Sequence, residues 1–366
     1  MRIVLIGGQC VPGIGGIESY VLNLGRELTK QKHKVTIICS DRSAYTTTID
    51  GIDIVHLVCP KSNIVAIPLL FLKSLKYIVS HRKDIDVVNF QSIFFAFISG
   101  WIARLCNCKV CYTIHSLAED NPKHNSLLKA AIRVASFFSI YGCGKRIITV
   151  SNSKAAEIKR RYGRTCTVIP CGVNRPLESP KSDILDRFGI TPGAYYLTIG
   201  RMDPIKNLDT LIQAFIDRGA TEHQLVLAGD YNNNHGMQLR DMAQEHKNII
   251  FVGPVMGEDK EYLLAHSYAN CLVSSSEGMP LSLLEAMSYS KPCIVSDIPA
   301  IREVLKDDWG LWCTARDVNS LSEQMKTMEA RYNEVIEKCP NMSAHVLNNH
   351  TWDRIAERYT SYILSL

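Results

Sequence analysis

Two glutamates beside a predicted turn are the first candidates for chemistry in this chain of 366 residues. Glu277 follows residues 271–273, an apolar run typical of a buried strand. Glu285 stands on the helix predicted next, with seven residues between the two glutamates. Pro280 occupies the place expected for the first helical residue, because its fixed φ angle suits that position. The pattern predicts a strand, a tight turn and a helix.

A phosphate group could bind at this helix start, because unpaired N–H groups and the positive end of the helix dipole attract anions. Glutamates repel phosphate, but they accept hydrogen bonds from sugar hydroxyls, as the acidic residue of dinucleotide sites does. The stretch therefore suggests a phosphate flanked by sugars. Glutamates near helix starts are also common without any ligand, so the stretch alone leaves both interpretations open.

Two cations in another loop would supply the positive charge that the glutamates lack. Residues 200–207 follow a strand predicted at 195–199, and they include Arg201 and Lys206. Arginine offers a planar fork of donors and lysine a compact point charge, so together they suit a diphosphate. Considered alone, this segment could also be an ordinary surface loop.

Glycines and a histidine mark a second candidate region in the first half of the chain. Gly15 and Gly16 lie between a strand predicted at 2–6 and a helix predicted at about 17–30, where backbone N–H groups can approach an anion. The spacing differs from the dinucleotide Gly-x-Gly-x-x-Gly pattern, so we predict no NAD site. His115 ends a predicted strand, where open α/β sheets bind ligands, and it could bond a sugar hydroxyl. An ordinary flexible loop and a packing histidine are the alternatives.

Strands and helices alternate along both halves of the chain, which predicts an α/β fold with two doubly wound parallel sheets. We place the first domain at 1–182, the second at 183–346 and a C-terminal helix at 347–366. A polar linker with two prolines, 175–181, joins the domains. Within the first domain, we predict one continuous helix at 94–105.

The composition is that of a globular protein, with 46% hydrophobic and 21% charged residues. The 13 cysteines are scattered and the chain start resembles a strand, so we expect reduced thiols in the cytoplasm. Residues 1–183 hold 25 Lys and Arg against 12 Asp and Glu, which favours an anionic partner. The basic residues are dispersed without a stacking platform, so we expect no nucleic acid. The apolar runs at 64–72 and 93–105 are shorter than the roughly 18 residues of a spanning helix.

Taken together, the motifs resemble the GT-B glycosyltransferases. They are most similar to the large retaining family, glycosyltransferase family 4-like or "glycosyl transferases group 1", which contains many bacterial polysaccharide and lipid glycosyltransferases. The similarity covers nearly the whole chain, and the ordered set is more specific than any single motif. The matching residues are Gly15-Gly16-Ile17-Glu18, Thr113-Ile114-His115, Val150-Ser151-Asn152-Ser153, Val168-Ile169-Pro170-Cys171-Gly172-Val173-Asn174, Gly200-Arg201-Met202 with Lys206-Asn207, Leu227-Ala228-Gly229-Asp230, and Glu277-Gly278-Met279-Pro280 with Glu285-Ala286-Met287.

This resemblance implies two Rossmann-like domains that face each other across a cleft, with the C-terminal helix crossing back to the first domain. The second domain would hold a nucleotide-diphosphate sugar, with UDP- or GDP-sugars expected and no cofactor. The first domain would hold a glycan or lipid-linked oligosaccharide acceptor. The implied reaction is the retaining transfer of a hexose-type sugar in bacterial surface polysaccharide synthesis, such as that of lipopolysaccharide.

The resemblance also implies roles for individual residues. Glu277 would contact the transferred sugar, Glu285 the donor ribose, and Arg201 with Lys206 the diphosphate, while His115 would lie near the sugar. The implied catalytic set is His115, Arg201, Lys206 and Glu277. The implied donor-binding set is Gly15, Gly16, Arg201, Lys206, Gly278, Met279, Pro280, Leu281 and Glu285.

Two segments depart from the family pattern. The family often has Asn-Gly-Val-Asp where this chain has Cys171-Gly172-Val173-Asn174. The glycine that commonly follows this aspartate in the family is missing after Asp230. The resemblance therefore implies nothing about how this chain recognises the nucleotide base.

We expect the reaction to be metal-independent, since cations and helix amides can stabilise the leaving diphosphate. Asp84-Ile85-Asp86 mimics an Asp-x-Asp metal motif, but it introduces a strand, and solvated turn carboxylates are the favoured interpretation. Cys108 and Cys111 have metal-like spacing, but no second pair lies close by, so they are expected to be core thiols.

Residues 68–77 mix apolar and basic side chains, as helices at an anionic membrane surface do. We predict peripheral attachment to the inner face of the plasma membrane through the first domain, although a buried helix with lysines reaching to solvent would show the same pattern. A sugar-nucleotide epimerase of the same fold is the alternative enzyme. A non-catalytic binding subunit is a third possibility, but the charged set at 201, 206, 277 and 285 argues against it.

Overall fold

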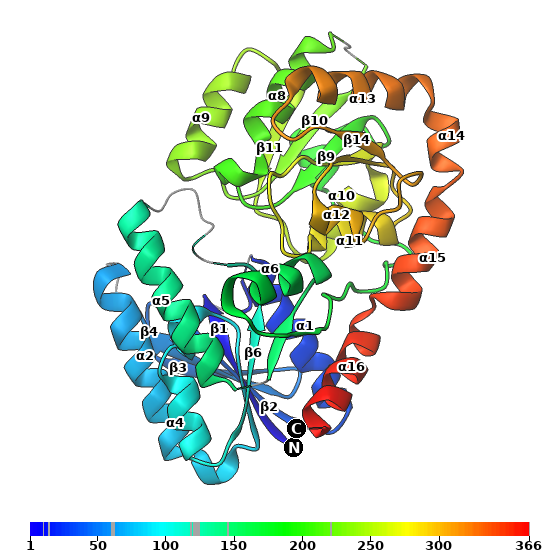
Figure 1. Cartoon of the computed structure of the whole chain (residues 1–366). Coiled ribbons are helices and arrows are strands. Elements are labelled where there is room, and N and C mark those ends of the chain that lie inside the picture. Colours follow the sequence, from blue (N-terminus) through cyan, green and yellow to red (C-terminus); the bar gives the residue numbers. More distant parts are fainter. Residues whose placement is uncertain are drawn as a thin grey trace. The chain divides into compact units, whose positions relative to one another are not determined.

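The computed structural model describes residues 1–9, 11–13, 15–59, 63–117, 119, 125–144, 146–219 and 222–365. The chain divides into two compact units, which we call unit 1 (Met1–Gly172 with Trp352–Leu366) and unit 2 (Val173–Thr351) (Figure 1). Ile14 of the predicted glycine loop lies outside the described residues, and so does the side chain of Pro68 in the stretch predicted to contact a membrane.

Unit 1 contains an eight-stranded sheet in the order β3-β4-β2-β1-β5-β6-β7-β8. Every neighbouring pair is parallel except β3 and β4, which are antiparallel. Residues 3–6 of β1 are all buried, as expected for a parallel strand with helices on both faces. The strands are β1 (Arg2–Gln9), β2 (Lys34–Asp41), β3 (Tyr45–Ile49), β4 (Ile52–Val58), β5 (Val87–Phe90), β6 (Lys109–Ile114), β7 (Ile147–Thr149) and β8 (Thr167–Val168).

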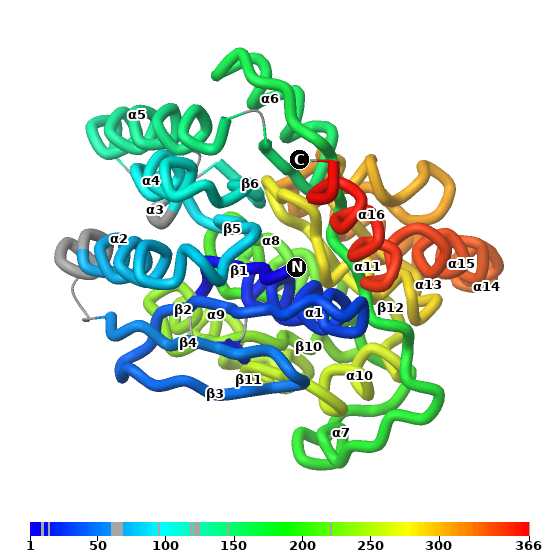
Figure 2. The backbone as a smooth tube through the Cα atoms, turned by 90° about the horizontal axis from the view of Figure 1, so that it is seen from below, coloured from blue at the N-terminus to red at the C-terminus, as the bar shows by residue number. Residues whose placement is uncertain are grey.

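The helices of unit 1 cover both faces of this sheet. Figure 2 shows α1 and α16 on one face and α2, α4 and α5 side by side on the other. Ser151 caps α6 by accepting a hydrogen bond from the Lys154 N–H, and Gly163 ends that helix with a φ of 64°. The helices are α1 (Gly16–Lys30), α2 (Asn63–Ser80), the short 3₁₀ helix η1 (Arg82–Asp84), α3 (Ile93–Ala96), α4 (Ser99–Leu105), α5 (Ser126–Gly142), α6 (Asn152–Tyr162) and α16 (Trp352–Leu364).

One local prediction for unit 1 was wrong, and one strand of unit 1 was missed. The single helix expected at 94–105 is divided into α3 and α4, because Phe97 leaves helical geometry with φ −37° and ψ −83°. After this break, Gly100 packs closely against α5 and the residue that follows it. A Cβ atom at Gly100 would lie 3.0 Å from the Cys143 sulfur and 3.2 Å from the Gly142 carbonyl carbon. The edge strand β3 was not predicted, because its threonine-rich sequence is mostly exposed and lacks an apolar alternation.

The C-terminal helix α16 belongs to unit 1, as the predicted crossing back to the first domain required. Ile355, Tyr359 and Ile363 form its buried face, and α16 packs along α1. The Tyr359 hydroxyl accepts a hydrogen bond of 2.8 Å from the Asn89 side-chain amide at the end of the sheet's central strands. This buried bond fixes the helix on the sheet.

Unit 2 contains a six-stranded parallel sheet in the order β11-β10-β9-β12-β13-β14. The strand predicted at 195–199 is β9, and the strand predicted at 271–273 is β12, which begins two residues earlier; the short edge strand β14 was not predicted. The strands are β9 (Tyr195–Ile199), β10 (Gln224–Ala228), β11 (Ile249–Gly253), β12 (Ala269–Leu272), β13 (Cys293–Ser296) and β14 (Leu311–Cys313).

The helices of unit 2 bury an apolar stripe against this sheet. In α8, for example, Leu208, Leu211, Ile212 and Phe215 are buried, with the spacing of one helix face. The helices are α7 (Ile184–Phe188), the 3₁₀ helix η3 (Pro204–Lys206), α8 (Leu208–Asp217), α9 (Asn234–Ala243), α10 (Gly257–His266), α11 (Leu281–Ser288), α12 (Pro299–Arg302), α13 (Val318–Ala330), α14 (Tyr332–Ile336) and α15 (Cys339–Asn349).

The borders between the units differ from the expected domain limits at 182/183 and 346/347. The segment that follows Gly172 belongs to unit 2, because the Val173 N–H donates to the His350 carbonyl and the Leu177 N–H to the Tyr289 hydroxyl. None of the helices in the described ranges combines the length and apolarity needed to cross a membrane.

Candidate functional site

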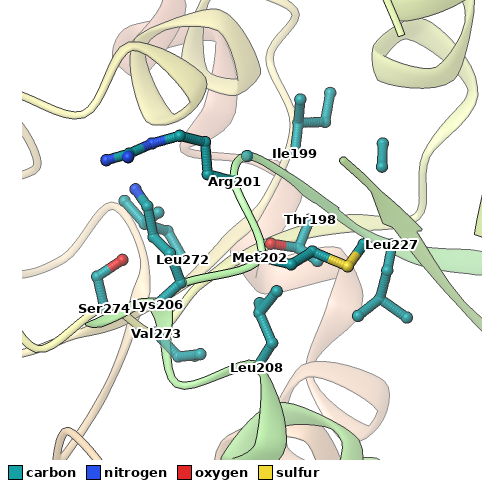
Figure 3. A pocket seen from close by; sticks show the side chains of 12 residues that line it. Thr198, Ile199, Arg201, Met202, Lys206, Leu208, Leu227, Leu272, Val273 and Ser274 are labelled. Carbon is teal, nitrogen blue, oxygen red and sulfur yellow. The ribbon is translucent and has the colours of Figure 1, made fainter. Parts of the chain in front are cut away.

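The first candidate site lies in unit 2, where the order of the strands reverses. The chain runs from β9 outward to β10 and β11, then returns to the other side of β9 with β12. Open α/β sheets bind ligands outside the carboxyl ends of the strands at such a switch point. A pocket opens there (Figure 3), and its walls are Thr198, Ile199, Gly200, Arg201, Met202, Lys206, Leu208, Leu227, Ala228, Leu272, Val273 and Ser274.

Lys206 and Glu277 form an ion pair at this edge of the sheet. The Lys206 ammonium lies 2.6 Å from a Glu277 carboxylate oxygen, and the two side chains are only 18% and 11% exposed. The sequence predicted both residues in one site but assigned them to different parts of the ligand. An ammonium has three donors, so Lys206 can hold Glu277 and still donate to an anion.

A buried hydrogen-bond network holds the loop of Lys206 in place. Asn207 has a left-handed φ of 50°, and its side-chain amide donates to the Val273 carbonyl (2.7 Å) and the Ser275 hydroxyl (2.8 Å). The Ser275 N–H donates to the Ile205 carbonyl at 2.9 Å, and Arg316 donates to both polar side chains. The loops after β9 and β12 are therefore fastened together, which fixes Lys206 beside Glu277.

Arg201 is much more exposed than Lys206. Its side chain is 69% exposed, and it pairs with Asp203 at 2.9 Å. Figure 3 shows that the charged ends of Arg201 and Lys206 extend to the same side of the pocket. Because a guanidinium has five N–H donors, Arg201 can bind an anion without releasing Asp203.

The turn before α11 follows Glu277 and consists of Gly278, Met279 and Pro280. The helix begins at Leu281, and Pro280 is the N-cap with an extended ψ of 104°, so the prediction that Pro280 is the first helical residue was wrong by one position. Its ring has no group that could cap the helix, so the N-cap residue makes no side-chain capping bond. The N–H groups of the first turn, starting with Leu281, therefore point out of the helix as anion donors.

Glu285 lies on α11 and pairs with a lysine that the sequence analysis missed. The Lys260 ammonium, on α10, lies 2.7 Å from a Glu285 oxygen and 3.5 Å from a Glu261 oxygen. Burial would lower the pKa of Lys260, but the two carboxylates outweigh it and raise that pKa above its usual value. Lys260 therefore stays charged and holds Glu285 in one orientation.

Gly229 brings the ends of β9 and β10 together under this site. A Cβ atom at Gly229 would lie 2.0 Å from the Gly200 carbonyl oxygen, a backbone atom that cannot move aside. Only glycine permits this approach, which explains the glycine in the motif Leu227-Ala228-Gly229-Asp230.

The second candidate site lies in unit 1, also at a switch point, because β1 has β2 on one side and β5 on the other. Gly15 is the N-cap of α1, with an extended φ of 178°, and Gly16 begins the helix. A Cβ atom at Gly15 would lie 2.0 Å from a carboxylate oxygen of Glu18. The acidic side chain thus occupies the space beside the helix start, and an anion at Gly16 would require it to move.

His115 follows β6 and is the polar centre of this second site. Its Nε2 lies 2.8 Å from the Gln91 side-chain oxygen, and its ring meets the edge of Tyr20 with 4.7 Å between ring centres. Burial lowers the pKa of His115 to about 4, so the ring is neutral near pH 7. Since an amide oxygen can only accept, His115 donates from Nε2, and its Nδ1 can accept a hydrogen bond from a hydroxyl.

The doubtful metal motifs have structural partners. Asp84 and Asp86 both pair with Arg2, at 3.0 and 3.2 Å. They precede β5, at the opposite end of that strand from Gln91. Cys108 and Cys111 are buried, and burial raises the pKa of the Cys111 thiol to about 12, as for a core residue. The described residues contain no group of three His, Cys, Asp or Glu side chains placed to share a metal ion.

Two family models match the chain in tandem. "Glycosyltransferase Family 4" matches residues 14–175, and "Glycosyl transferases group 1" matches residues 184–344. The chain belongs to the group 1 glycosyltransferases.

Two curated relatives of this glycosyltransferase are bacterial sugar transferases. The Escherichia coli UDP-Gal:alpha-D-GlcNAc-diphosphoundecaprenol alpha-1,3-galactosyltransferase is 25% identical over 351 residues, which cover 87% of this chain and 86% of that protein. The Escherichia coli O-antigen chain mannosyltransferase B is 30% identical over 190 residues, which cover 49% of this chain and 50% of that protein.

Solved structures share the fold of this glycosyltransferase. Sucrose-phosphate synthase from Thermosynechococcus elongatus has a TM-score of 0.83 at 19% identity, covering 100% of this chain and 98% of that one. Anabaena Alr3699/HepE in complex with UDP-glucose has a TM-score of 0.79 at 17% identity, with both chains fully covered. The predicted GT-B class of the fold is confirmed.

The structure of this glycosyltransferase groups the predicted site residues by unit. Arg201, Lys206 and Glu277 meet at the carboxyl ends of β9 and β12, and Gly278, Met279, Pro280 and Leu281 form the adjoining turn. Glu285 is held by Lys260, whereas Gly15, Gly16 and His115 belong to unit 1. Lys260, Arg316 and Gln91 were missed. For the hydrogen-bond network between the loops after β9 and β12, the sequence signal was Asn207, which belongs to a family motif.

Proposed function

We propose that this glycosyltransferase moves a hexose-type sugar from a nucleotide-diphosphate sugar to a glycan or lipid-linked oligosaccharide, with retention of the anomeric configuration. The Lys206–Glu277 pair, fixed beside the uncapped start of α11, carries the proposal. It places a cation, a carboxylate and helix N–H groups at one switch point, which is the chemistry that a diphosphate flanked by sugar hydroxyls requires.

The donor would occupy unit 2, with each predicted residue in the role that its contacts allow. Lys206 and Arg201 would bind the diphosphate together with the N–H groups of the first turn of α11. Glu277 would accept from hydroxyls of the transferred sugar, and Glu285 from the ribose. UDP- or GDP-sugars are the expected donors. The Anabaena structure, in which a protein of the same fold was solved with UDP-glucose, supports this choice.

The transfer would proceed on one face of the sugar through an oxocarbenium-like state. The bond from the anomeric carbon to the phosphate oxygen breaks, the bond to the acceptor oxygen forms, and the acceptor proton passes to the leaving phosphate. Lys206, Arg201 and the α11 amides would stabilise the negative charge that develops on the diphosphate. His115, neutral near pH 7, would orient a hydroxyl through Nδ1 rather than supply positive charge.

Metal independence is part of the proposal, because fixed cations already stand where charge develops and both carboxylates of the Asp-x-Asp segment pair with Arg2. Product formation should be the same in EDTA and in Mg²⁺ or Mn²⁺. Activity that EDTA abolishes and either metal restores would contradict this part.

A neutral polar pair in unit 1, His115 and Gln91, fits the acceptor. The Gln91 side-chain nitrogen is buried without a hydrogen-bond partner among the described residues, and its oxygen already accepts from His115. A buried donor of this kind is stabilised when a ligand oxygen accepts from it. We propose that sugar hydroxyls of a lipid-linked acceptor bind here, which agrees with the diphosphoundecaprenol-linked acceptor of the galactosyltransferase relative.

A membrane surface is the proposed location of this acceptor, and helix α5 of unit 1 supports the proposal. Its exposed face is apolar, with Leu127, Val134 and Phe138 exposed by 81%, 58% and 44%. Its buried face contains Ser136 and Ser139 beside Ile132 and Ile140. A helix that buries serines and exposes large apolar residues is typical of an interaction surface.

Basic residues make an anionic lipid surface the fitting occupant of this face. Helix α5 carries Lys129 and Arg133 and no acidic residue, and the neighbouring α4 adds Trp101 and Leu105, exposed by 43% and 84% (Figure 2). Apolar insertion combined with basic charge suits an anionic interface. The predicted stretch in α2 contributes less, because Leu70 and Tyr77 pack against the core.

Sedimentation with vesicles tests the membrane surface. The protein should bind vesicles that contain phosphatidylglycerol at low salt. The variant F137S/F138S, which replaces Phe138 and the adjacent Phe137 (45% exposed), should weaken binding. M237S is the matched control, because Met237 is 52% exposed in unit 2. Equal binding by all three proteins, or no binding at all, would contradict this location.

Product analysis tests the proposed reaction itself. Nucleotide sugars that raise the melting temperature are incubated with and without glycan acceptors, and the anomeric configuration of the product is determined by NMR. Transfer with retention is expected. Epimerisation of the donor in the absence of acceptor would identify the epimerase instead.

A further inference from the structure

A chain of hydrogen bonds extends from Glu285 to the segment that links the units. The Lys260 ammonium donates to the Oε1 atom of Glu285 at 2.7 Å and lies 3.5 Å from the Oε1 atom of Glu261. The other oxygen of Glu261 accepts from the Tyr289 hydroxyl at 2.7 Å. The Tyr289 oxygen in turn accepts from the Leu177 N–H at 3.0 Å.

The contacts decide which group donates at each step. Lysine and backbone N–H groups only donate and ionised carboxylates only accept, so the Tyr289 hydroxyl must donate to Glu261 while accepting from Leu177. Lys260 and Glu285 are only 20% and 23% exposed, which strengthens the bond between them compared with a surface pair. Lys260 thus binds Oε1 of Glu285, and among the described residues no hydrogen bond engages Oε2, so we assign Oε2 to a ligand hydroxyl.

We propose that Lys260 is a positioning residue for the donor. It fixes the Glu285 carboxylate so that Oε2 accepts from the ribose hydroxyls, and Glu261 and Tyr289 hold Lys260 in place. The inference rests on the proposed function, which assigns the ribose to Glu285. It adds that recognition of the ribose depends on a residue of α10 that does not itself contact the donor.

The alternative is that Lys260 only stabilises the packing of α10 on α11. These two roles differ in what they do to ligand selectivity. A packing residue changes the melting temperature and weakens all ligands alike. A positioning residue changes the preference for a nucleotide that has its ribose hydroxyls over one that lacks them.

Calorimetry with UDP and GDP and their 2′-deoxy and 3′-deoxy analogues measures that preference. In the wild type, removal of the ribose hydroxyl that donates a hydrogen bond to Glu285 should weaken binding about 10- to 100-fold, as expected for a hydrogen bond to a charged group. K260M should bind the parent nucleotide more weakly than the wild type by the same factor. It should bind the parent nucleotide and its deoxy analogue equally well. K260R should restore part of the preference, and Y289F should reduce it less than K260M.

Two variants separate the possible failures. K154M is the matched control, because Lys154 is 11% exposed and lies 2.9 Å from Glu157 on α6 of unit 1, and it should keep the wild-type preference. If E285Q abolishes the preference but K260M keeps it, Lys260 does not position Glu285. If E285Q itself keeps the preference, the ribose assignment of the proposed function is wrong, and the inference fails with it.

Kinetics give a second readout. K260M should raise the KM for the donor and leave kcat near the wild-type value, because Lys206 and Glu277 are untouched. An equal loss in kcat for K260M and K206A would overturn the positioning role.

Discussion

The two sheets carry different chemistry at the same topological position. At the switch point of unit 2, the loops after β9 and β12 place Lys206 against Glu277, and Arg201 beside Asp203. At the switch point of unit 1, His115 and Gln91 form a neutral pair. Each sheet therefore presents polar side chains at this edge, and among the described residues the central pair is an ion pair in unit 2 and a neutral pair in unit 1.

The difference indicates what each edge can bind. Charged groups held by buried hydrogen bonds stabilise an anion with little reorganisation, which suits a diphosphate leaving group. Neutral donors and acceptors suit hydroxyl groups, whose recognition needs direction rather than charge. A transferase needs both, because one substrate leaves as an anion and the other attacks as an alcohol.

The largest expected effect is that of K206A. Removing the ammonium should lower kcat by about 10²- to 10³-fold, since a fixed donor to the developing charge is lost and Glu277 is left without its partner. Initial rates at saturating donor measure this. K154A, which removes the lysine of another partly buried pair, serves as the control. Unchanged turnover in K206A would contradict the view that the unit 2 edge stabilises developing negative charge and the unit 1 edge does not.

The next effect concerns the backbone under the charged edge. G229A should lower the free energy of unfolding by about 1–3 kcal/mol, because its Cβ would overlap the Gly200 carbonyl oxygen. G200A is a matched control, since the nearest atom to its Cβ would be 3.9 Å away, and it should change stability by less than about 0.5 kcal/mol. Urea denaturation measures both. Equal stabilities would show that the β9–β10 ends are not held as tightly as described.

R201A tests whether the more exposed cation, Arg201, contributes less to catalysis than Lys206. The Arg201 side chain is 69% exposed and screened by water, so its loss should lower kcat/KM only about tenfold. A decrease as large as that of K206A would mean that Arg201 becomes buried against the donor in the working complex.

The smallest expected effect tests the neutrality of the edge in unit 1. Burial lowers the pKa of His115 from 6.5 to about 4, so the unfolded chain binds more protons between these values. The stabilisation is therefore fully present above pH 6.5 and is lost as the pH falls towards 4. H115Q should show a flatter loss of stability in that interval by denaturant titration, while H81Q, at an exposed histidine, should follow the wild type. A wild-type slope in H115Q would mean that His115 already carries a charge.

Sequence patterns predicted most of the architecture, because they record local interactions. The alternation of buried strands and amphipathic helices predicted both sheets, and Ser151 and Gly163 mark the ends of α6 as capping rules require. The missed strand β3 is a mostly exposed edge with little apolar pattern, and the missed edge strand β14 has only three residues. The break between α3 and α4 depends on packing against α5, which no local pattern records.

The candidate site was predicted as a set of residues but not as a set of contacts. The ordered motifs named Arg201, Lys206, Glu277 and Glu285, and the types of these residues indicated a diphosphate flanked by hydroxyls. That Lys206 bonds Glu277, 71 positions away, and that Lys260 holds Glu285 followed only from the structure.

The sequence by itself determined the kinds of group that each loop carries, because side-chain chemistry and local propensity belong to the chain. The tertiary structure alone decided which groups meet, which oxygen of a carboxylate stays available and which histidine is neutral. Those properties depend on burial and on distances across the ends of neighbouring strands, and distant parts of the chain acquire them only when the sheets assemble.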